Sequence, residues 1–218
     1  DYPLKRDAEK MFLNFWNISN EDPRRNRDGV YFKKTNEIEG IIVEIIGLDT
    51  RYFRSKLKGK KNAYKQNNDL KATILGQNQW SWLEESIYNS SADIIMILSS
   101  IQILATNHPY EKWDNFPLER KRILKLIANA SKDKTIIAIS GDRHRSGIYQ
   151  NEDFIEITAS SLNKSASKNI ETDPLLIGRT YPIKNFGILD IEPSKNKVTI
   201  SIHDQNGLKL NSKIINID

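Results

Sequence analysis

The chain has 218 residues, of which 38% are hydrophobic and 28% charged, and this composition suits one globular domain, residues 1–218, with a substantial core. Its formal net charge of +5 comes from scattered Lys and Arg, so it favours anionic partners only weakly. The sequence has no cysteine, which excludes disulfides and thiolate metal sites, and its apolar runs are too short to span a bilayer.

The N-terminal third predicts a helix followed by two strands. Apolar residues recur at three- and four-residue steps over residues 4–16, which is typical of an amphipathic helix whose apolar stripe packs on a core. Residues 29–32 and 39–48 alternate or run apolar, as two strands would. The lysine-rich run at residues 56–61 suits either a solvated surface loop or an electrostatic funnel for a phosphate-bearing substrate.

The middle of the chain alternates between helices and buried strands. Residues 76–87 predict a helix, and the continuously apolar residues 93–99 predict a strand buried on both faces. Pro117 suits the first turn of a second helix, and residues 135–139 predict a second buried strand. This alternation indicates an α/β layered domain, in which functional residues are expected at the strand ends.

The C-terminal part, after Gly147, predicts strands only. They are expected at residues 154–158, 186–191 and 198–203, with the turn of a closing hairpin at residues 206–207. Residues 161–180 are polar and rich in Ser, Lys and Asn, so we expect a long surface loop there.

One histidine stands in a promising position. His144 follows the predicted strand at residues 135–139, in the segment Ser-Gly-Asp-Arg-His. Gly141 permits a sharp turn, and Asp142 and His144, two residues apart, can point to the same side and share a cation. Taken alone, this short motif is a weak signal and favours a capped turn with an ordinary surface histidine.

Six segments occur in an order that is similar to that of one enzyme family. They are residues 47–54, 74–83, 98–102, 112–120, 140–144 and 156–161. Together, over about residues 4–161, they resemble the C-terminal half of the alkaline phosphatase D (PhoD-like) family of metallophosphoesterases.

The resemblance implies an α/β fold, a four-layer α/β/β/α sandwich, here without its N-terminal part. It also implies a dinuclear centre of iron and calcium, in which metal-activated water attacks phosphorus. Asp142 and His144 match the family's Gly-Asp-x-His motif and would be catalytic metal ligands. The family's upstream ligand segments have no counterpart here, so we expect the chain by itself to be inactive. Relatives are commonly exported, so a periplasmic or extracellular location is expected if a signal precedes the chain.

Two arginines follow the strand predicted at residues 39–48. Arg51 and Arg54 could clamp a phosphate with their guanidinium groups, or could form ion pairs with Asp49 that tie the two sheets together. The sequence leaves both interpretations open.

Further polar candidates follow the next predicted strand. Ser100 and Gln102 stand where many other metallophosphoesterases carry a metal-binding histidine, and here they suggest only a polar lining of the site. His108 suits a substrate-binding or proton-transfer role, or simple lid decoration. We expect Thr158, Ser160 and Ser161 to hydrogen-bond the backbone near His144. Three of the four tryptophans, Trp80, Trp82 and Trp113, are interpreted as core and interface aromatics.

The leading hypothesis is a hydrolase of phosphate mono- or diesters. An alternative is a non-catalytic basic module that binds nucleic acid or another anionic polymer through the lysine run, although no nucleic-acid motif supports it. A third is a family member kept as an interaction domain. The coding sequence upstream of Asp1 would separate these hypotheses. Substrate, metal identity and oligomeric state are left open.

Overall fold

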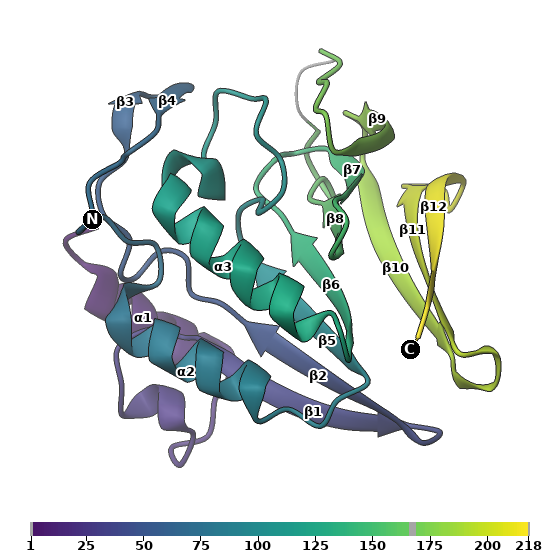
Figure 1. Ribbon diagram of the computed structural model, residues 1–218. Helices are drawn as coiled ribbons and strands as arrows, with labels where there is room; N and C mark the ends of the chain where they lie inside the picture. The colour runs from purple at the N-terminus through teal and green to yellow at the C-terminus, as the bar shows by residue number, and fades with distance from the viewer. Residues whose placement is uncertain (1, 166–168, 218) are drawn as a thin grey trace.

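The computed structural model describes residues 2–165 and 169–217. Its centre is a seven-stranded mixed sheet (Figure 1). The strands lie in the order β1 (Phe32–Ile38), β2 (Ile41–Gly47), β5 (Ile94–Ser99), β6 (Thr135–Ser140), β8 (Ile155–Ala159), β7 (Ser146–Gln150) and β9 (Leu176–Tyr181). Because β2, β5, β6 and β8 are parallel, their carboxyl ends meet at one edge of the sheet.

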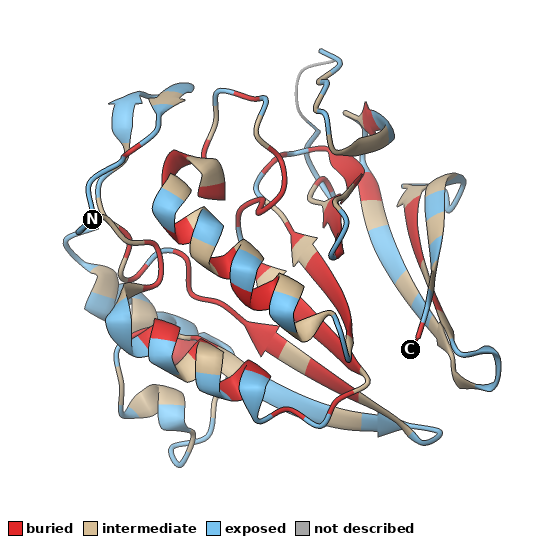
Figure 2. Cartoon of the chain, in the orientation of Figure 1, coloured by how far each residue is buried: buried red, intermediate tan, exposed pale blue. Residues whose placement is uncertain are grey.

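The two faces of this sheet are covered differently. The helices α2 (Gly76–Tyr88) and α3 (Pro117–Ala130) cover one face, where Trp80 and Trp113 are fully buried. A three-stranded antiparallel sheet covers the other: β10 (Asn185–Glu192), β11 (Lys197–Asp204) and β12 (Lys209–Asn216). Figure 2 shows the buried residues concentrated on the central strands and on the inner faces of the helices.

The described residues therefore form three layers, helix, sheet and sheet, which confirms the α/β fold class. The helix layer outside the second sheet, expected from the resemblance, has no counterpart within residues 2–165 and 169–217 (Figure 1). The remaining short elements are the hairpin β3 (Lys58–Lys60) and β4 (Ala63–Lys65) and the 3₁₀ turns Pro23–Arg25, Trp113–Asn115 and Pro193–Lys195.

The first helix, α1 (Lys5–Phe15), forms as predicted, but its apolar stripe does not enter the core. Leu13 is its buried residue, whereas Met11 is 72% exposed, Phe15 80% and the following Trp16 61%. The expected burial of this stripe is therefore wrong for the described residues. In the part of the chain that the structure describes, no helix has the length and apolar character needed to cross a membrane.

Three predicted segments differ from the structure. The first strand begins only at Phe32, because the Val30 N–H bonds the Asp49 carboxylate and the Tyr31 carbonyl accepts from Arg27, so neither pairs with a strand. The lysine run is not a plain loop but the exposed hairpin β3–β4. The predicted loop at residues 161–180 ends in β9, and residues 166–168 lie outside the described residues.

Candidate functional site

Polar side chains form the base of the carboxyl edge. Ser140, at the end of β6, pairs in register with Ser99 of β5 and with Thr158 of β8. The hydroxyl groups of Ser140 and Thr158 lie 2.8 Å apart, and Gln102 Nε2 donates to Thr158 Oγ1 at 2.9 Å. Gln102 is only 1% exposed, so its side chain bonds Thr158 inside the protein. Its predicted role in lining the site stays a prediction.

The turn after β6 presents two side chains to solvent. Asp142 (φ +65°) and His144 (φ +52°) both have left-handed backbone, which costs about 1–2 kcal/mol for each residue that is not glycine. Both are exposed, whereas the intervening Arg143 is 5% exposed and Arg145 3%. The backbone of the turn therefore alternates its side chains between solvent and the interior.

Ser160 fixes the backbone of this turn. Its hydroxyl accepts from the Arg143 N–H at 3.0 Å and donates to the Arg145 carbonyl at 3.2 Å. The predicted backbone contact is confirmed for Ser160. Thr158 instead bonds side chains, and Ser161 donates to the Lys164 carbonyl.

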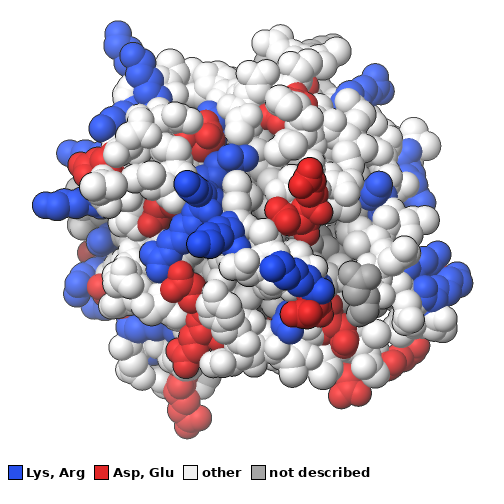
Figure 3. All heavy atoms as spheres, in the orientation of Figure 1, with Lys and Arg blue, Asp and Glu red and all other residues white. Residues whose placement is uncertain are grey.

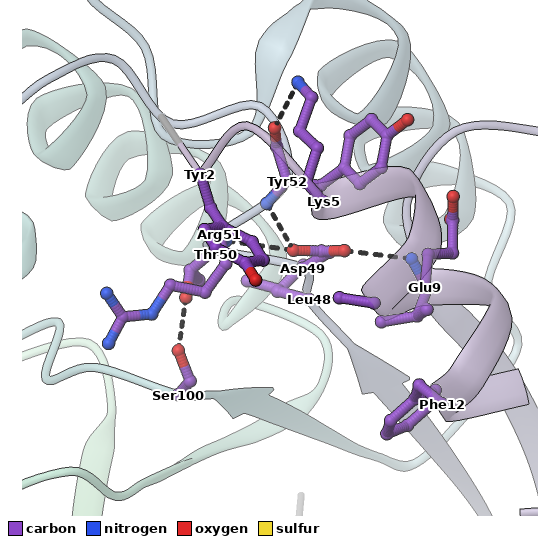
Figure 4. Close-up of a pocket in the computed structure, with 12 residues that line it drawn as sticks. Tyr2, Lys5, Glu9, Phe12, Leu48, Asp49, Thr50, Arg51, Tyr52 and Ser100 are labelled. Atoms are coloured by element: carbon purple, nitrogen blue, oxygen red, sulfur yellow. Dashed lines mark hydrogen bonds between the residues drawn. The ribbon is translucent and has the colours of Figure 1, made fainter. Parts of the chain in front are cut away.

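Among the described residues, Asp49 forms no ion pair with the guanidinium groups of the arginines that follow it. Its carboxylate accepts from three backbone N–H groups, those of Val30 (3.0 Å), Arg51 (2.9 Å) and Tyr52 (2.8 Å). The ion-pair alternative is thus wrong about Asp49, because the carboxylate that both arginines share is that of Glu111. In Figure 4 the Arg51 side chain extends away from Asp49, on the side of Ser100.

The two arginines differ in exposure and in what they can reach. Arg51 Nη1 lies 2.7 Å from Glu111 Oε2 and its Nη2 lies 3.9 Å from Asp142 Oδ1, and half of its side chain is exposed. Arg54 is buried, with Nε 3.1 Å from Glu111 Oε1, and burial lowers the pKa of its guanidinium. The structure therefore places the Arg51 side chain beside Asp142 at the candidate site. Arg54 lies in the interior, where it contacts Glu111.

His108 is buried rather than part of an exposed lid. Its Nδ1 accepts from the Tyr110 N–H at 3.2 Å, and 8% of the residue is exposed. Burial, and then the positive charges of Arg143, Lys112 and Arg145, lower its pKa to about 2. The imidazole is therefore neutral at physiological pH, and its predicted role in substrate binding or proton transfer is not tested by this geometry.

A groove of about 320 Å³ adjoins the site, between α1 and the carboxyl ends of β2 and β5 (Figure 4). It is lined on one side by Tyr2, Lys5, Ala8, Glu9 and Phe12, and on the other by Val30, Leu48–Tyr52 and Ser100. The visible face in Figure 3 carries both signs of charge, with one group of Lys and Arg near its centre. This mixed surface agrees with a weak preference for anions.

The donor atoms of Asp142 and His144 suit a metal, since a carboxylate oxygen and an imidazole nitrogen bind iron and related ions. Within residues 2–165 and 169–217, however, no group of three or more His, Cys, Asp or Glu side chains could hold a metal ion. The described residues therefore supply at most part of a coordination shell and do not form a complete metal centre.

Two residues of this site could not be found from sequence. Glu111 lies in a loop without periodicity, and only the fold brings it to the arginines, 60 residues away in sequence from Arg51. Glu171, in the predicted surface loop, bonds Arg143 from 28 residues downstream. A lone acidic residue in a polar segment carries no signal that distinguishes it from its neighbours.

Comparison with solved structures identifies a similar fold in PhoD, in GAP50 and in a purple acid phosphatase. PhoD aligns with a TM-score of 0.63 and 16% identity over 85% of this chain and 40% of its own. GAP50, "the anchor in the inner membrane complex of Plasmodium", aligns with a TM-score of 0.63 and 14% identity, over 87% of this chain and 55% of its own. Purple acid phosphatase PPD1 from yellow lupin (Lupinus luteus) seeds aligns with a TM-score of 0.55 and 14% identity, over 96% of this chain and 35% of its own.

The chain thus spans less than two thirds of the length of these structural relatives. The search of curated proteins found no match. The family profile described as PhoD-like phosphatase matches residues 3–199, nearly the whole chain. The chain therefore belongs to the PhoD-like phosphatase family.

Proposed function

We propose that this chain forms part of the active site of a phosphate-ester hydrolase. One observation carries the proposal: a strained turn at the carboxyl edge exposes Asp142 and His144, and the Arg51 guanidinium lies 3.9 Å from the Asp142 carboxylate. Glu111 forms an ion pair with the other terminal nitrogen of the same guanidinium, Nη1. A guanidinium fork in this position would bind phosphate oxygens beside the two side chains of the turn.

We also propose that Asp142 and His144 each contribute one ligand atom to iron or calcium, and that the remaining ligands come from outside the described residues. Iron bound there would lower the pKa of its water and so would supply the attacking hydroxide. The residues of this chain would orient the ester: Arg51 binds the phosphate, and Ser160 holds the turn that carries Asp142 and His144.

The test compares residues 1–218 with the same protein extended upstream. Hydrolysis of 4-nitrophenyl phosphate and of bis(4-nitrophenyl) phosphate is measured with iron and calcium added, for the parent proteins and for Asp142→Ala and His144→Ala. We expect activity in the extended protein alone, lost in both variants, because each removes one ligand atom. His203→Gln serves as the control, since the His203 ring bonds Ser201 and the Gly207 carbonyl and stacks on Phe186, within the sheet of β10, β11 and β12.

The outcomes separate the hypotheses. The ratio of the hydrolysis rates of the two substrates shows whether the enzyme prefers monoesters or diesters. Inactivity of both proteins would favour a non-catalytic family member. Activity of residues 1–218 alone would contradict the argument that the ligand set is incomplete.

A further inference from the structure

Two buried arginines alternate with the exposed residues of the turn. Asp142 and His144 face solvent, while Arg143 and Arg145 are 5% and 3% exposed. A buried guanidinium needs a counter-charge and hydrogen-bond acceptors. Whatever holds these two arginines inward therefore also decides where Asp142 and His144 point.

Glu171 supplies the counter-charge to both arginines. Its Oε1 lies 2.5 Å from Arg143 Nη2, and its Oε2 lies 3.5 Å from Arg145 Nε. The Glu171 side chain is 18% exposed, so solvent screens these pairs only in part. One carboxylate thus bridges two guanidinium groups that flank His144 in sequence.

Glu171 belongs to a segment, residues 169–173, that we call the strap. The Asn169 carbonyl accepts from Arg145 Nη1 at 2.8 Å, and the Asp173 carboxylate accepts from the Thr106 and Asn107 N–H groups at 2.7 and 2.8 Å. The strap therefore contacts the turn at one end and the loop that leads to His108 at the other.

The Arg143 guanidinium also packs over a ring from that loop. Its central carbon lies 4.5 Å from the centre of the Tyr110 ring. This cation–π contact and the strap fix the guanidinium in two directions. The inward position of Arg143 is therefore determined by contacts from residues 110 and 171, both remote in sequence from the turn.

We propose that Glu171 is a positioning residue, which keeps Arg143 and Arg145 inward and thereby keeps Asp142 and His144 exposed in their left-handed conformation. Without its charge, two buried guanidinium groups lose their shared partner and move toward water. The strained backbone of the turn then relaxes, because such strain persists only where surrounding contacts enforce it. The conformational part of this inference stands alone, and its catalytic consequence rests on the proposed function.

The experiment uses the extended protein and Glu171→Gln, which keeps the shape of the side chain and removes its charge. We expect kcat for 4-nitrophenyl phosphate to fall about 10- to 100-fold, the range seen when a group that orients a catalytic residue is lost, while KM changes little. Hydrogen exchange of the backbone amides at residues 142–146 should become faster.

Glu84→Gln is the matched control. This variant also removes the charge of a carboxylate that pairs with an arginine, because Glu84 Oε1 lies 2.8 Å from Arg122 Nη2. That ion pair, however, joins α2 to α3. We expect it to change neither kcat nor exchange in the turn. Glu171→Asp keeps the charge, yet its shorter side chain reaches only one arginine, so it should give intermediate values of both quantities.

Parental exchange in Glu171→Gln would overturn the proposal, and faster exchange with unchanged kcat would overturn its catalytic consequence. If Glu171→Gln does not fold, parental exchange and kcat in Glu171→Asp would overturn it equally. If the parent protein lacks phosphatase activity, the proposed function fails, while the exchange measurement still decides whether Glu171 holds the turn.

Discussion

At the scale of single residues, His108 gives the clearest dependence on pH. Burial lowers its pKa to about 2 in the folded protein, whereas an unfolded histidine titrates near its model value of 6.5. Below that value the unfolded state binds a proton that the folded state rejects. The contribution of His108 to stability is therefore complete above pH 6.5 and is lost progressively as the pH falls toward 2.

We expect protonation of His108 in the unfolded state to lower the free energy of unfolding by about 2 kcal/mol when the pH falls from 7 to 5. Urea unfolding at both pH values would measure this loss. His108→Gln removes the titrating group, so subtraction of its pH dependence cancels the carboxylates common to both proteins. Equal pH dependence in the two proteins would show that His108 takes up a proton in the folded state.

The limits of prediction from sequence are also visible at single residues. Asp142 and His144 stand out because a glycine turn follows an apolar strand, and Trp80 and Trp113 because aromatic residues seek the core. The partnership of Glu171 with Arg143 leaves no trace of this kind. A contact between residues far apart in sequence follows from the path of the backbone, not from local pattern.

At the scale of elements, the loop after β5 is held by a fully buried carboxylate. Glu156, in β8, accepts from the N–H groups of Ile103 at 2.9 Å and Leu104 at 2.6 Å. Arg120, in α3, donates to the carbonyl groups of the same two residues at 2.8 and 2.9 Å. The sheet and the helix thus satisfy opposite sides of one peptide segment.

Glu156→Gln should lower the free energy of unfolding by about 1–3 kcal/mol, the usual cost of a buried group left without its partner. The amide has one acceptor oxygen and therefore satisfies only one of the two N–H groups. Urea unfolding measures the loss, and Glu152→Gln, a variant of an exposed glutamate before β8, is the control. A stability equal to that of the parent would mean that Glu156 is already protonated, in agreement with the raised pKa that burial causes.

The same scale shows which elements a sequence can predict. The ends of the buried strands β5 and β6 and of the helix α2 lie within about one residue of their predicted bounds, and α3 begins at Pro117 as predicted, because each has a strong apolar pattern. The strand β7, Ser-Gly-Ile-Tyr-Gln, is short and has little pattern of its own. It forms because β8 and β9 pair with it on both sides.

At the scale of the whole molecule, a cluster of apolar side chains near the N-terminus is open to solvent. Met11, Phe12 and Phe15 on α1 are 72%, 42% and 80% exposed, and Trp16, which follows the helix, is 61% exposed. The rings of Phe15 and Trp16 lie 5.2 Å apart and form one continuous patch with Phe12. Large exposed apolar patches promote association, whereas single exposed apolar residues do not.

Residues 1–218 should therefore self-associate as their concentration rises, and the double variant Phe15→Gln with Trp16→Gln should shift them toward monomer, as measured by sedimentation velocity. The thermal unfolding midpoint should change little, because neither ring enters the core. Leu208→Gln is the matched control, since Leu208 is 65% exposed in the β11–β12 turn, away from the patch. Equal association in all three proteins would contradict the argument, because the attraction would then arise from another surface, whereas loss in the double variant alone assigns it to the exposed face of α1.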